Sequence, residues 1–354
     1  MDYKRLFLRK GLIITFLLAT FSLYSKDKTE ISALKRQKER MKPIIQQVKE
    51  NLRPIEDAEF NKFSEEEEKY EEFYGLNNKN VLHKMGRIDS GGYRIAVQIF
   101  APMQTEIKGT VLAMHGYMEH TGTNSDLLKL LLEEDYRVIA YDMPGHGLSG
   151  GTPASIKDFK EYSSVMRNIL VFAKKNYILP DIIIAHSTGC SAVLQFIAEE
   201  KTLDLSKIIL IAPLVRSTHW KLSKVVYYSS KLILWKSAPR LFPKVSNDIE
   251  FLNFLKYGEP IQYKKIPYQW LNALYKWEKI THLWKTKKID VTMIFATADT
   301  TTDWKYNMQF LKKKFPKSNF SEIPNGRHAL LNDSYKYRKQ VFQIIEKTLN
   351  NLKK

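Results

Sequence analysis

The stretch Asp181–Glu200, DIIIAHSTGCSAVLQFIAEE, places a serine at the corner between two kinds of local structure. The β-branched run Ile182–Ile184 is typical of a buried strand, and the pattern after Ser187 is typical of a helix. A strand that turns directly into a helix leaves room only for small side chains two positions from the corner, and Ala185 and Gly189 meet this requirement. The stretch therefore predicts that Ser187 is a nucleophile whose hydroxyl stands clear of the sheet.

A serine nucleophile needs a general base, and the base needs an acid that orients it. In such an architecture the acid and then the histidine follow the serine along the chain. Asp299 comes just after a strand-like run, in FATADTTTD, and His328 lies in the turn-rich IPNGRHALL. Both follow carboxyl ends of predicted strands, where open parallel sheets build their sites. We predict Asp299 as the acid and His328 as the base, because the alternative acid, Asp303, stands where a helix N-cap is expected.

Two backbone N–H groups are expected to stabilise the oxyanion that forms when the serine attacks. The N–H of Thr188 is one of them, because it lies at the start of the helix after Ser187. The second must come from the loop after the strand that ends at Met114. Gly116 lets the backbone turn there, so we predict the N–H of Tyr117 as the second donor.

The same loop holds His115 and His120, residue types that also bind metals. Neither a carboxylate nor a third histidine accompanies them at ligand spacing. Cys190 is the single cysteine, so the sequence contains no Cys-based metal site and no intrachain disulfide. We predict no metal and no cofactor, and we interpret these histidines, together with Glu119 and Asp142, as residues that support the loops.

Strand-like and helix-like segments alternate from Tyr93 to Pro213, which indicates an α/β fold with a mostly parallel central sheet and helices on both faces. After Pro213 a segment rich in Trp, Tyr, Leu and Lys shows no strand pattern, and IDVTMIFATAD then resumes the sheet. We predict one domain over residues 75–354 with an inserted helical cap over about residues 214–288.

The amino-terminal part has two sections outside this domain. Residues 1–25 carry basic residues followed by an apolar run, Gly11–Tyr24, that is shorter than the roughly 20 residues of a membrane-spanning helix. This pattern predicts an exported or membrane-anchored protein, with a signal peptide or an uncleaved N-terminal anchor. Residues 26–74 are rich in Lys and Glu with apolar residues at helical spacing, and predict a charged helical stalk or linker.

The net charge is +18, from 56 Lys and Arg against 38 Asp and Glu. These basic residues are dispersed among aromatic and aliphatic ones, and no zinc-finger or RNA-recognition motif accompanies them, so we predict no nucleic-acid partner. Tryptophans and lysines are mixed in the predicted cap, which favours contact of the cap and the N-terminus with a membrane surface. The alternative is an ordinary packed lid whose aromatic residues form its own core.

Five segments occur in an order and at spacings that resemble one family: LAMHGYMEHTG, AYDMPGHGLSGG, IAHSTGCSA, FATADTTTD and IPNGRHALLN. It is the α/β-hydrolase family, in the branch of monoacylglycerol lipases, bacterial lysophospholipases and serine-aminopeptidase-like hydrolases. The resemblance runs from about Phe73 to the C-terminus. The departures from the family pattern, Ala185, Cys190 and Ala296, all replace one small residue by another.

The resemblance implies that Ser187, Asp299 and His328 form the catalytic triad and that Tyr117 and Thr188 form the oxyanion hole. It implies a serine hydrolase of carboxylic esters, acting on a lipid or another small ester through an acyl-enzyme. Two alternatives stay open. One is an aminopeptidase-like enzyme, for which a cap carboxylate such as Asp248, Glu250 or Glu259 would hold the substrate's amine, and the other is a non-catalytic surface protein on a retained hydrolase fold.

Overall fold

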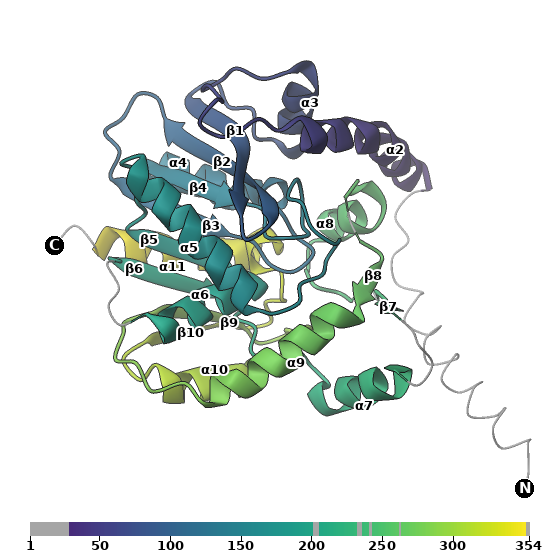
Figure 1. The fold of residues 1–354 in the computed structure, drawn as a ribbon, viewed down its shortest axis with the longest axis vertical. Coiled ribbons are helices and arrows are strands. Elements are labelled where there is room, and N and C mark those ends of the chain that lie inside the picture. Colours follow the sequence, from purple (N-terminus) through teal and green to yellow (C-terminus); the bar gives the residue numbers. More distant parts are fainter. Residues whose placement is uncertain (1–27, 201–204, 232–235, 241–242, 262, 352–354) are drawn as a thin grey trace, which may run out of the picture.

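The computed structural model describes residues 28–200, 205–231, 236–240, 243–261 and 263–351 (Figure 1). The predicted leader, residues 1–25, lies outside the described residues.

An eight-stranded sheet runs through the centre of the molecule in the order β1-β2-β4-β3-β5-β6-β9-β10. Its strands are β1 Val81–Ser90, β2 Tyr93–Pro102, β3 Gly109–Met114, β4 Tyr136–Tyr141, β5 Ile182–His186, β6 Lys207–Ile211, β9 Thr292–Ala296 and β10 Asn319–Ile323. Strand β2 is antiparallel to both of its neighbours, and all the other pairs are parallel. The predicted α/β fold with a mostly parallel sheet is confirmed, and β1 is a strand that the sequence analysis did not predict.

Helices cover both faces of the sheet. The helices of the described residues, including those of the cap, are α2 Lys28–Asn51, α3 Glu65–Tyr74, α4 Ser125–Glu133, α5 Lys160–Lys175, α6 Thr188–Glu199, α7 Trp220–Lys231, α8 Ile249–Asn253, α9 Tyr268–His282, α10 Trp304–Lys314 and α11 Tyr335–Asn350. Helices α5, α6 and α10 share one hydrophobic cluster with the sheet, while α2, α4 and α11 share the other. Figure 1 shows α5 and α6 in front of the sheet and α4 and α11 behind it.

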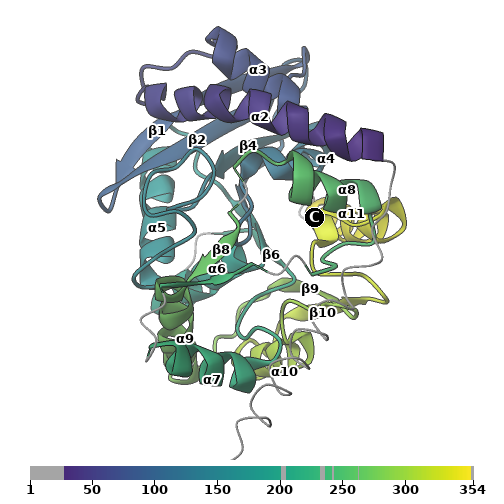
Figure 2. The same ribbon diagram turned by 90° about the vertical axis from the view of Figure 1, so that its right-hand side faces the viewer.

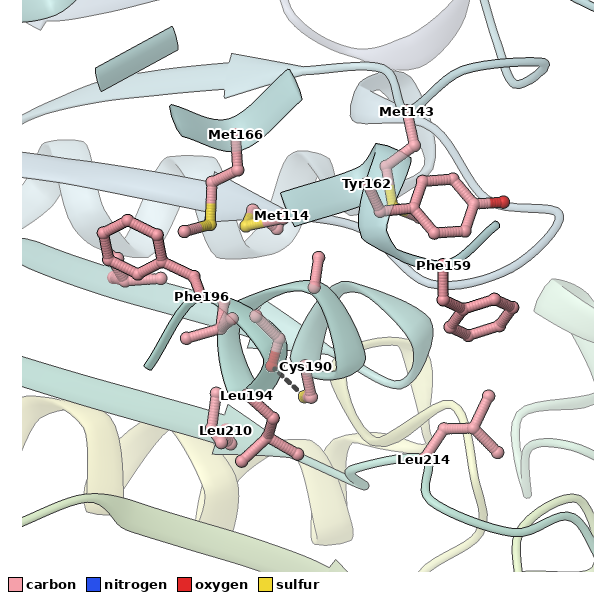
Figure 3. Packing of buried hydrophobic residues seen from close by; sticks show 14 of the residues in the cluster. Met114, Met143, Phe159, Tyr162, Met166, Cys190, Leu194, Phe196, Leu210 and Leu214 are labelled. Atoms are coloured by element: carbon pink, nitrogen blue, oxygen red, sulfur yellow. Dashed lines mark hydrogen bonds between the residues drawn. The ribbon is translucent and has the colours of Figure 1, made fainter. Parts of the chain in front are cut away.

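The apolar run of β5 is buried on both sides because side chains alternate between the two faces of a strand. Ile183 and Ala185 belong to the cluster under α5 and α6, and Ile182 and Ile184 belong to the opposite one. Figure 3 shows Cys190 of α6 inside the first cluster. The continuous apolar sequence is therefore what a central parallel strand requires.

The segment between β6 and β9 forms the cap, with helices α7, α8 and α9. It also contains a short antiparallel pair, β7 (Ser237–Pro239) with β8 (Lys265–Pro267), where the sequence shows no strand pattern. Strands of three residues are too short for a period of two to be visible in a sequence. Within the cap, Trp277 is fully buried and packs against Phe159 of the domain below.

Residues 26–74 are expected to form a stalk, and the structure differs from this expectation. Helices α2 and α3 do form, but they lie against the domain. Helix α2 contacts the π-helix Phe254–Gly258, which continues α8 of the cap, and both views show α2 beside this part of the cap (Figures 1 and 2). The apolar face of α2, with Met41, Ile45 and Val48, is buried in the cluster of α4 and α11. A mostly charged helix can still pack against a domain when a few apolar residues form one stripe along it. The high content of charged residues hid this stripe, so the sequence predicted a stalk.

Replacing Ile45 by alanine should therefore destabilise the whole domain. The side chain is fully buried, so Ile45→Ala should lower the free energy of unfolding by about 3 kcal/mol in urea titrations. Gln47→Ala, at an exposed position of the same helix, is the control and should change stability by less than about 0.5 kcal/mol. Equal unfolding curves for the two variants would show that α2 folds as a separate stalk.

Candidate active site

Ser187 stands between β5 and α6 in a backbone conformation that side-chain-bearing residues rarely adopt. Its φ is +49° and its ψ is −110°, which matches the strained strand-to-helix turn predicted from the sequence. A Cβ atom added to Gly189 would lie 2.6 Å from the carbonyl oxygen of His115, so the helix can approach the neighbouring loop only with glycine there. The small residues around Ser187 are therefore explained by close contact as well as by the turn.

The structure brings together the three side chains predicted as nucleophile, base and acid. His328 Nε2 lies 2.9 Å from Ser187 Oγ, and His328 Nδ1 lies 2.7 Å from Asp299 Oδ2. All three residues are buried. With Asp299 accepting the Nδ1–H, the Nε2 atom of a neutral ring is free to accept the proton of the serine hydroxyl.

Asp299 is held by its own loop as well as by the histidine. Its carboxylate accepts hydrogen bonds from the backbone N–H groups of Thr301 and Thr302 and from the Thr302 hydroxyl. Burial opposes the charged form, but the imidazole of His328 and these donors outweigh it and lower the pKa of Asp299. Asp303, the alternative acid, instead caps α10 by accepting from the backbone N–H of Tyr306.

The two predicted oxyanion donors belong to segments that adjoin Ser187. Thr188 is the first residue of α6, so its N–H is among those that have no partner inside the helix. Tyr117 follows Gly116, and a Cβ added to Gly116 would lie 3.1 Å from Ser187 Cβ. The loop that carries Tyr117 therefore passes next to the serine, as the sequence analysis expects.

The side chain of Tyr117 joins this loop to the cap. Its ring stacks on Trp270 of α9 with 3.8 Å between the ring centroids, and its hydroxyl donates to the carbonyl oxygen of Ala154 at 2.7 Å. The ring thus fixes the direction of the Tyr117 backbone by contacts with two other segments.

His186 is a site residue that the sequence analysis did not identify, although it directly precedes Ser187. Its Nδ1 lies 3.0 Å from Glu119 Oε2 and its Nε2 lies 3.0 Å from the carbonyl oxygen of His328. Because both neighbours are acceptors, both ring nitrogens donate and the ring is an imidazolium. Burial opposes this charge, but Glu119 and the His328 carbonyl raise the pKa of His186. The charged ring therefore holds the backbone of His328.

Glu119 completes this arrangement. It accepts from the backbone N–H of Gly116 at 2.8 Å as well as from His186. Burial raises the pKa of a carboxyl, but the positive ring of His186 and the Gly116 N–H lower the pKa of Glu119 to about 2. The prediction that Glu119 supports its loop is confirmed, and the partner that makes this support strong is His186.

Asp333 is a second residue that the sequence analysis missed. It is fully buried and accepts from the backbone N–H groups of Asn247, Arg327 and Ser334. These bonds tie the loop that carries His328 to the segment before α8. The sequence signal was the motif IPNGRHALLND, which ends at this aspartate.

His115 and Asp142, which were also predicted to support the loops, have that role. His115 Nε2 accepts from the backbone N–H of Met143, and Asp142 accepts from Thr121 and Leu148. In the part of the chain that the structure describes, no three His, Cys, Asp or Glu side chains converge as metal ligands would.

The cap carboxylates considered for binding an amine have other partners in the structure. Asp248 caps α8 by accepting from the backbone N–H of Phe251. Glu259 is buried, accepts from the Tyr74 hydroxyl at 2.8 Å and lies 3.5 Å from His120 Nε2.

A serine hydroxyl, an imidazole and a carboxylate in line at the carboxyl edge of a mostly parallel sheet, beneath an inserted cap, define the α/β-hydrolase class of protein. The family described as "Serine aminopeptidase, S33" matches residues 105–335. The chain belongs to this family.

Curated relatives are similar over part of the chain. A monoacylglycerol lipase of Mycolicibacterium smegmatis is 29% identical over 50% of this chain and 64% of its own length. The monoglyceride lipase of Homo sapiens is 29% identical over 36% of this chain and 42% of its own length. The chain thus spans less than two thirds of either relative.

Solved structures share the fold. A soluble variant of the monoglyceride lipase of Saccharomyces cerevisiae superposes with a TM-score of 0.64 at 18% identity, covering 76% of this chain and 94% of the lipase. The monoacylglycerol lipase of Paleococcus ferrophilus gives a TM-score of 0.59 at 19% identity, and the match covers 70% of this chain and 96% of that lipase.

The pair of Glu119 and His186 predicts a pH window for stability. His186 has a raised pKa, so its contribution is complete below its usual value of 6.5 and is lost as the pH rises through the folded value. Glu119 has a lowered pKa, so its contribution is complete above 4.5 and is lost as the pH falls toward 2. Glu119→Gln should therefore lower the free energy of unfolding most between pH 4.5 and pH 6.5. We expect a loss of about 3 kcal/mol there, measured by urea titration.

The control is Glu133→Gln, at an exposed position of α4, which should change stability little at any pH. A loss of stability in Glu119→Gln that is constant with pH, or greatest in alkaline solution, would contradict a charged pair of Glu119 and His186.

Proposed function

We propose that this chain is a serine hydrolase that cleaves carboxylic esters with one fatty acyl chain, through an acyl-enzyme on Ser187. The observation that carries the proposal is the line of contacts from Ser187 Oγ to His328 and from His328 to Asp299, at 2.9 and 2.7 Å. Supporting it are the family, and relatives named as monoacylglycerol and monoglyceride lipases.

In this mechanism His328 Nε2 takes the proton of Ser187 as the hydroxyl oxygen attacks the ester carbonyl. The oxyanion is held by the N–H groups of Tyr117 and Thr188, and Asp299 stabilises the imidazolium that forms. His328 then gives its proton to the leaving alcohol. A water molecule, deprotonated by the same ring, then attacks the acyl carbonyl. The bond from the carbonyl to Ser187 Oγ breaks as His328 returns the proton to that oxygen, and the fatty acid leaves.

His186 and Glu119 do not take part in these proton transfers. Their role is to position the reacting groups, because His186 holds the backbone of His328 and Glu119 holds that of Gly116 beside Ser187. In this proposal the base and one oxyanion donor are thus fixed by a single buried ion pair.

The two alternative functions, an aminopeptidase and a non-catalytic surface protein, have less support from the site. An aminopeptidase needs a carboxylate available to the substrate's amine, whereas Asp248 caps a helix and Glu259 binds Tyr74. A non-catalytic surface protein has no need for a nucleophile held in a strained conformation within hydrogen-bond distance of an oriented base.

Substitutions at the two neighbouring aspartates test the mechanism. Asp299→Asn should lower kcat for an acyl p-nitrophenyl ester by about 10³–10⁴-fold, because the ring of His328 is left in the wrong tautomer. Asp303→Asn is the matched control and should keep activity within about threefold, losing only part of a helix cap. Ser187→Ala should lose activity and labelling by a fluorophosphonate.

Equal losses in the two aspartate variants, or labelling that survives Ser187→Ala, would refute the mechanism. Faster release from an aminoacyl anilide than from the acyl ester would favour the peptidase.

We further propose that the protein is exported or anchored through residues 1–25 and that helix α7 of the cap rests on a lipid surface. Leu222, Val225, Val226 and Tyr228 of α7 are all more than half exposed. Lys221, which is exposed on the same helix, supplies positive charge for anionic headgroups. Among the described residues no helix is both long and apolar enough to cross a bilayer.

Val225 and Val171 offer a matched comparison for this surface. They are 62% and 63% exposed, on α7 and α5 respectively. Val225→Ser should weaken cosedimentation with phosphatidylglycerol vesicles by about fivefold, because the serine cannot make the apolar contact that Val225 makes in the lipid interface. Val171→Ser should not change binding, and equal effects of the two substitutions would place the lipid contact elsewhere.

A further inference from the structure

The loop of residues 115–120, the Tyr117 loop, has a backbone that needs support from its surroundings. Met118, directly after Tyr117, has a φ of +61°, a left-handed conformation that residues with a side chain rarely adopt. Such a conformation persists only where neighbouring groups enforce it. The position of the Tyr117 N–H, the predicted oxyanion donor, therefore depends on the contacts that hold this loop.

Two neighbouring residues of opposite charge hold the Tyr117 loop. Glu119 contacts His186 beside the sheet. His120 instead contacts Glu259 of the cap, with 3.5 Å between His120 Nε2 and Glu259 Oε2, and these two residues are 3% and 1% exposed. Burial opposes the charge of His120, but Glu259 first, and then Asp142 and Glu119, raise the pKa of its ring. Neither ring nitrogen of His120 makes a hydrogen bond within the described residues, so the ion pair with Glu259 compensates the burial of the ring.

Tyr74, the last residue of α3, holds the carboxylate of Glu259. Its hydroxyl donates to Glu259 Oε1 at 2.8 Å, and its ring lies edge-on to the ring of His120 with 4.9 Å between the centroids. A Cβ added to Gly122 would lie 2.6 Å from the Tyr74 ring, so the segment after the Tyr117 loop approaches this tyrosine as closely as only glycine allows. Tyr74 therefore contacts both members of the ion pair.

Helix α2 supports the backbone of Glu259. This residue directly follows the π-helix Phe254–Gly258, which α2 contacts. The approach is close, because a Cβ added to Gly258 would lie 3.1 Å from Leu34 Cδ2 of α2. Figure 2 shows α2 lying across this part of the cap. Helices α2 and α3 lie outside residues 105–335, the part of the chain that matches the family, so this support is added to the matched fold.

We propose that Tyr74 and Glu259 are positioning residues for the reaction. The N-terminal helices hold the carboxylate of Glu259 against His120, and this contact keeps the Tyr117 N–H where it can donate to the oxyanion. The inference rests on the proposed ester hydrolase and names the part of the chain that keeps its oxyanion donor in place. Both residues act through the backbone of the Tyr117 loop, so their loss should weaken binding of the transition state rather than of the substrate.

The test measures kcat and KM separately with p-nitrophenyl octanoate. Tyr74→Phe should lower kcat about fivefold and leave KM within about twofold, because the oxyanion contact forms only in the transition state. Glu259→Gln removes the charge that compensates His120 and should lower kcat about twentyfold. The double variant should lose no more than Glu259→Gln alone, since Tyr74 acts through Glu259. Tyr74→Phe keeps the ring against Gly122, so the test does not depend on how well Glu259→Gln folds.

The matched control is Tyr70→Phe, which removes a buried hydroxyl from the same helix. The Tyr70 hydroxyl accepts from Gln98 of β2 at 3.3 Å and does not bind the cap carboxylate. Tyr70→Phe and Tyr74→Phe should lower stability in urea titrations to a similar extent, but Tyr70→Phe should keep kcat within about twofold. An equal fall of kcat in the two variants, or a rise of KM with kcat unchanged in Tyr74→Phe, would overturn the proposal.

Hydrogen exchange separates this proposal from the proposed hydrolase. The N–H groups of Gly116 and Glu119 are hydrogen-bonded within the Tyr117 loop. In a Ser187→Ala background, Tyr74→Phe and Glu259→Gln should speed their exchange about tenfold, and Tyr70→Phe should not, whether or not the wild type cleaves esters. Unchanged exchange in all three variants would overturn the positioning role. A wild type that a fluorophosphonate does not label, with the expected exchange in the variants, would refute the hydrolase alone.

Discussion

The backbone of Ser187, at a φ of +49°, is the constraint on which the site depends. Such a conformation costs about 1–3 kcal/mol and persists only where the surroundings enforce it. Here the Ser187 N–H donates to Ile211 of β6, its carbonyl accepts from Leu214, and Gly189 packs against the carbonyl of His115. The turn is therefore held by the neighbouring strands rather than by its own residues. That support presents the hydroxyl to the ring of His328.

The second requirement is that the loops carrying Glu119 and His328 keep their positions relative to this turn. The buried imidazolium of His186 reaches Glu119 in one loop and the backbone of His328 in another. Asp333 ties the His328 loop to the segment before α8. Charged hydrogen bonds in a buried site are strong, and removing one partner leaves the other without compensation. Ser187, His328 and the loop that carries Tyr117 therefore form one connected polar network.

The cap and the N-terminal helices extend this network outward. Tyr74 of α3 donates to Glu259 of the cap, and Glu259 lies close to His120 of the oxyanion loop. Tyr117 stacks on Trp270 from the other side. Residues 28–74 of the charged segment are thus part of the body that supports the site. Helix α2 consists mostly of charged and polar residues because a helix that packs along one narrow stripe needs few apolar residues.

Local sequence determined the strands of the central sheet other than β1, the chain order of the predicted nucleophile, acid and base, and the small residues around Ser187, because these depend on side-chain period, turn sterics and the carboxyl ends of strands. The partnership of His186 with Glu119, the role of Asp333, the short β7–β8 pair and the packing of α2 were decided by the tertiary structure alone. Each of them joins segments far apart in the chain, and no local pattern records which polar group will be buried beside which other.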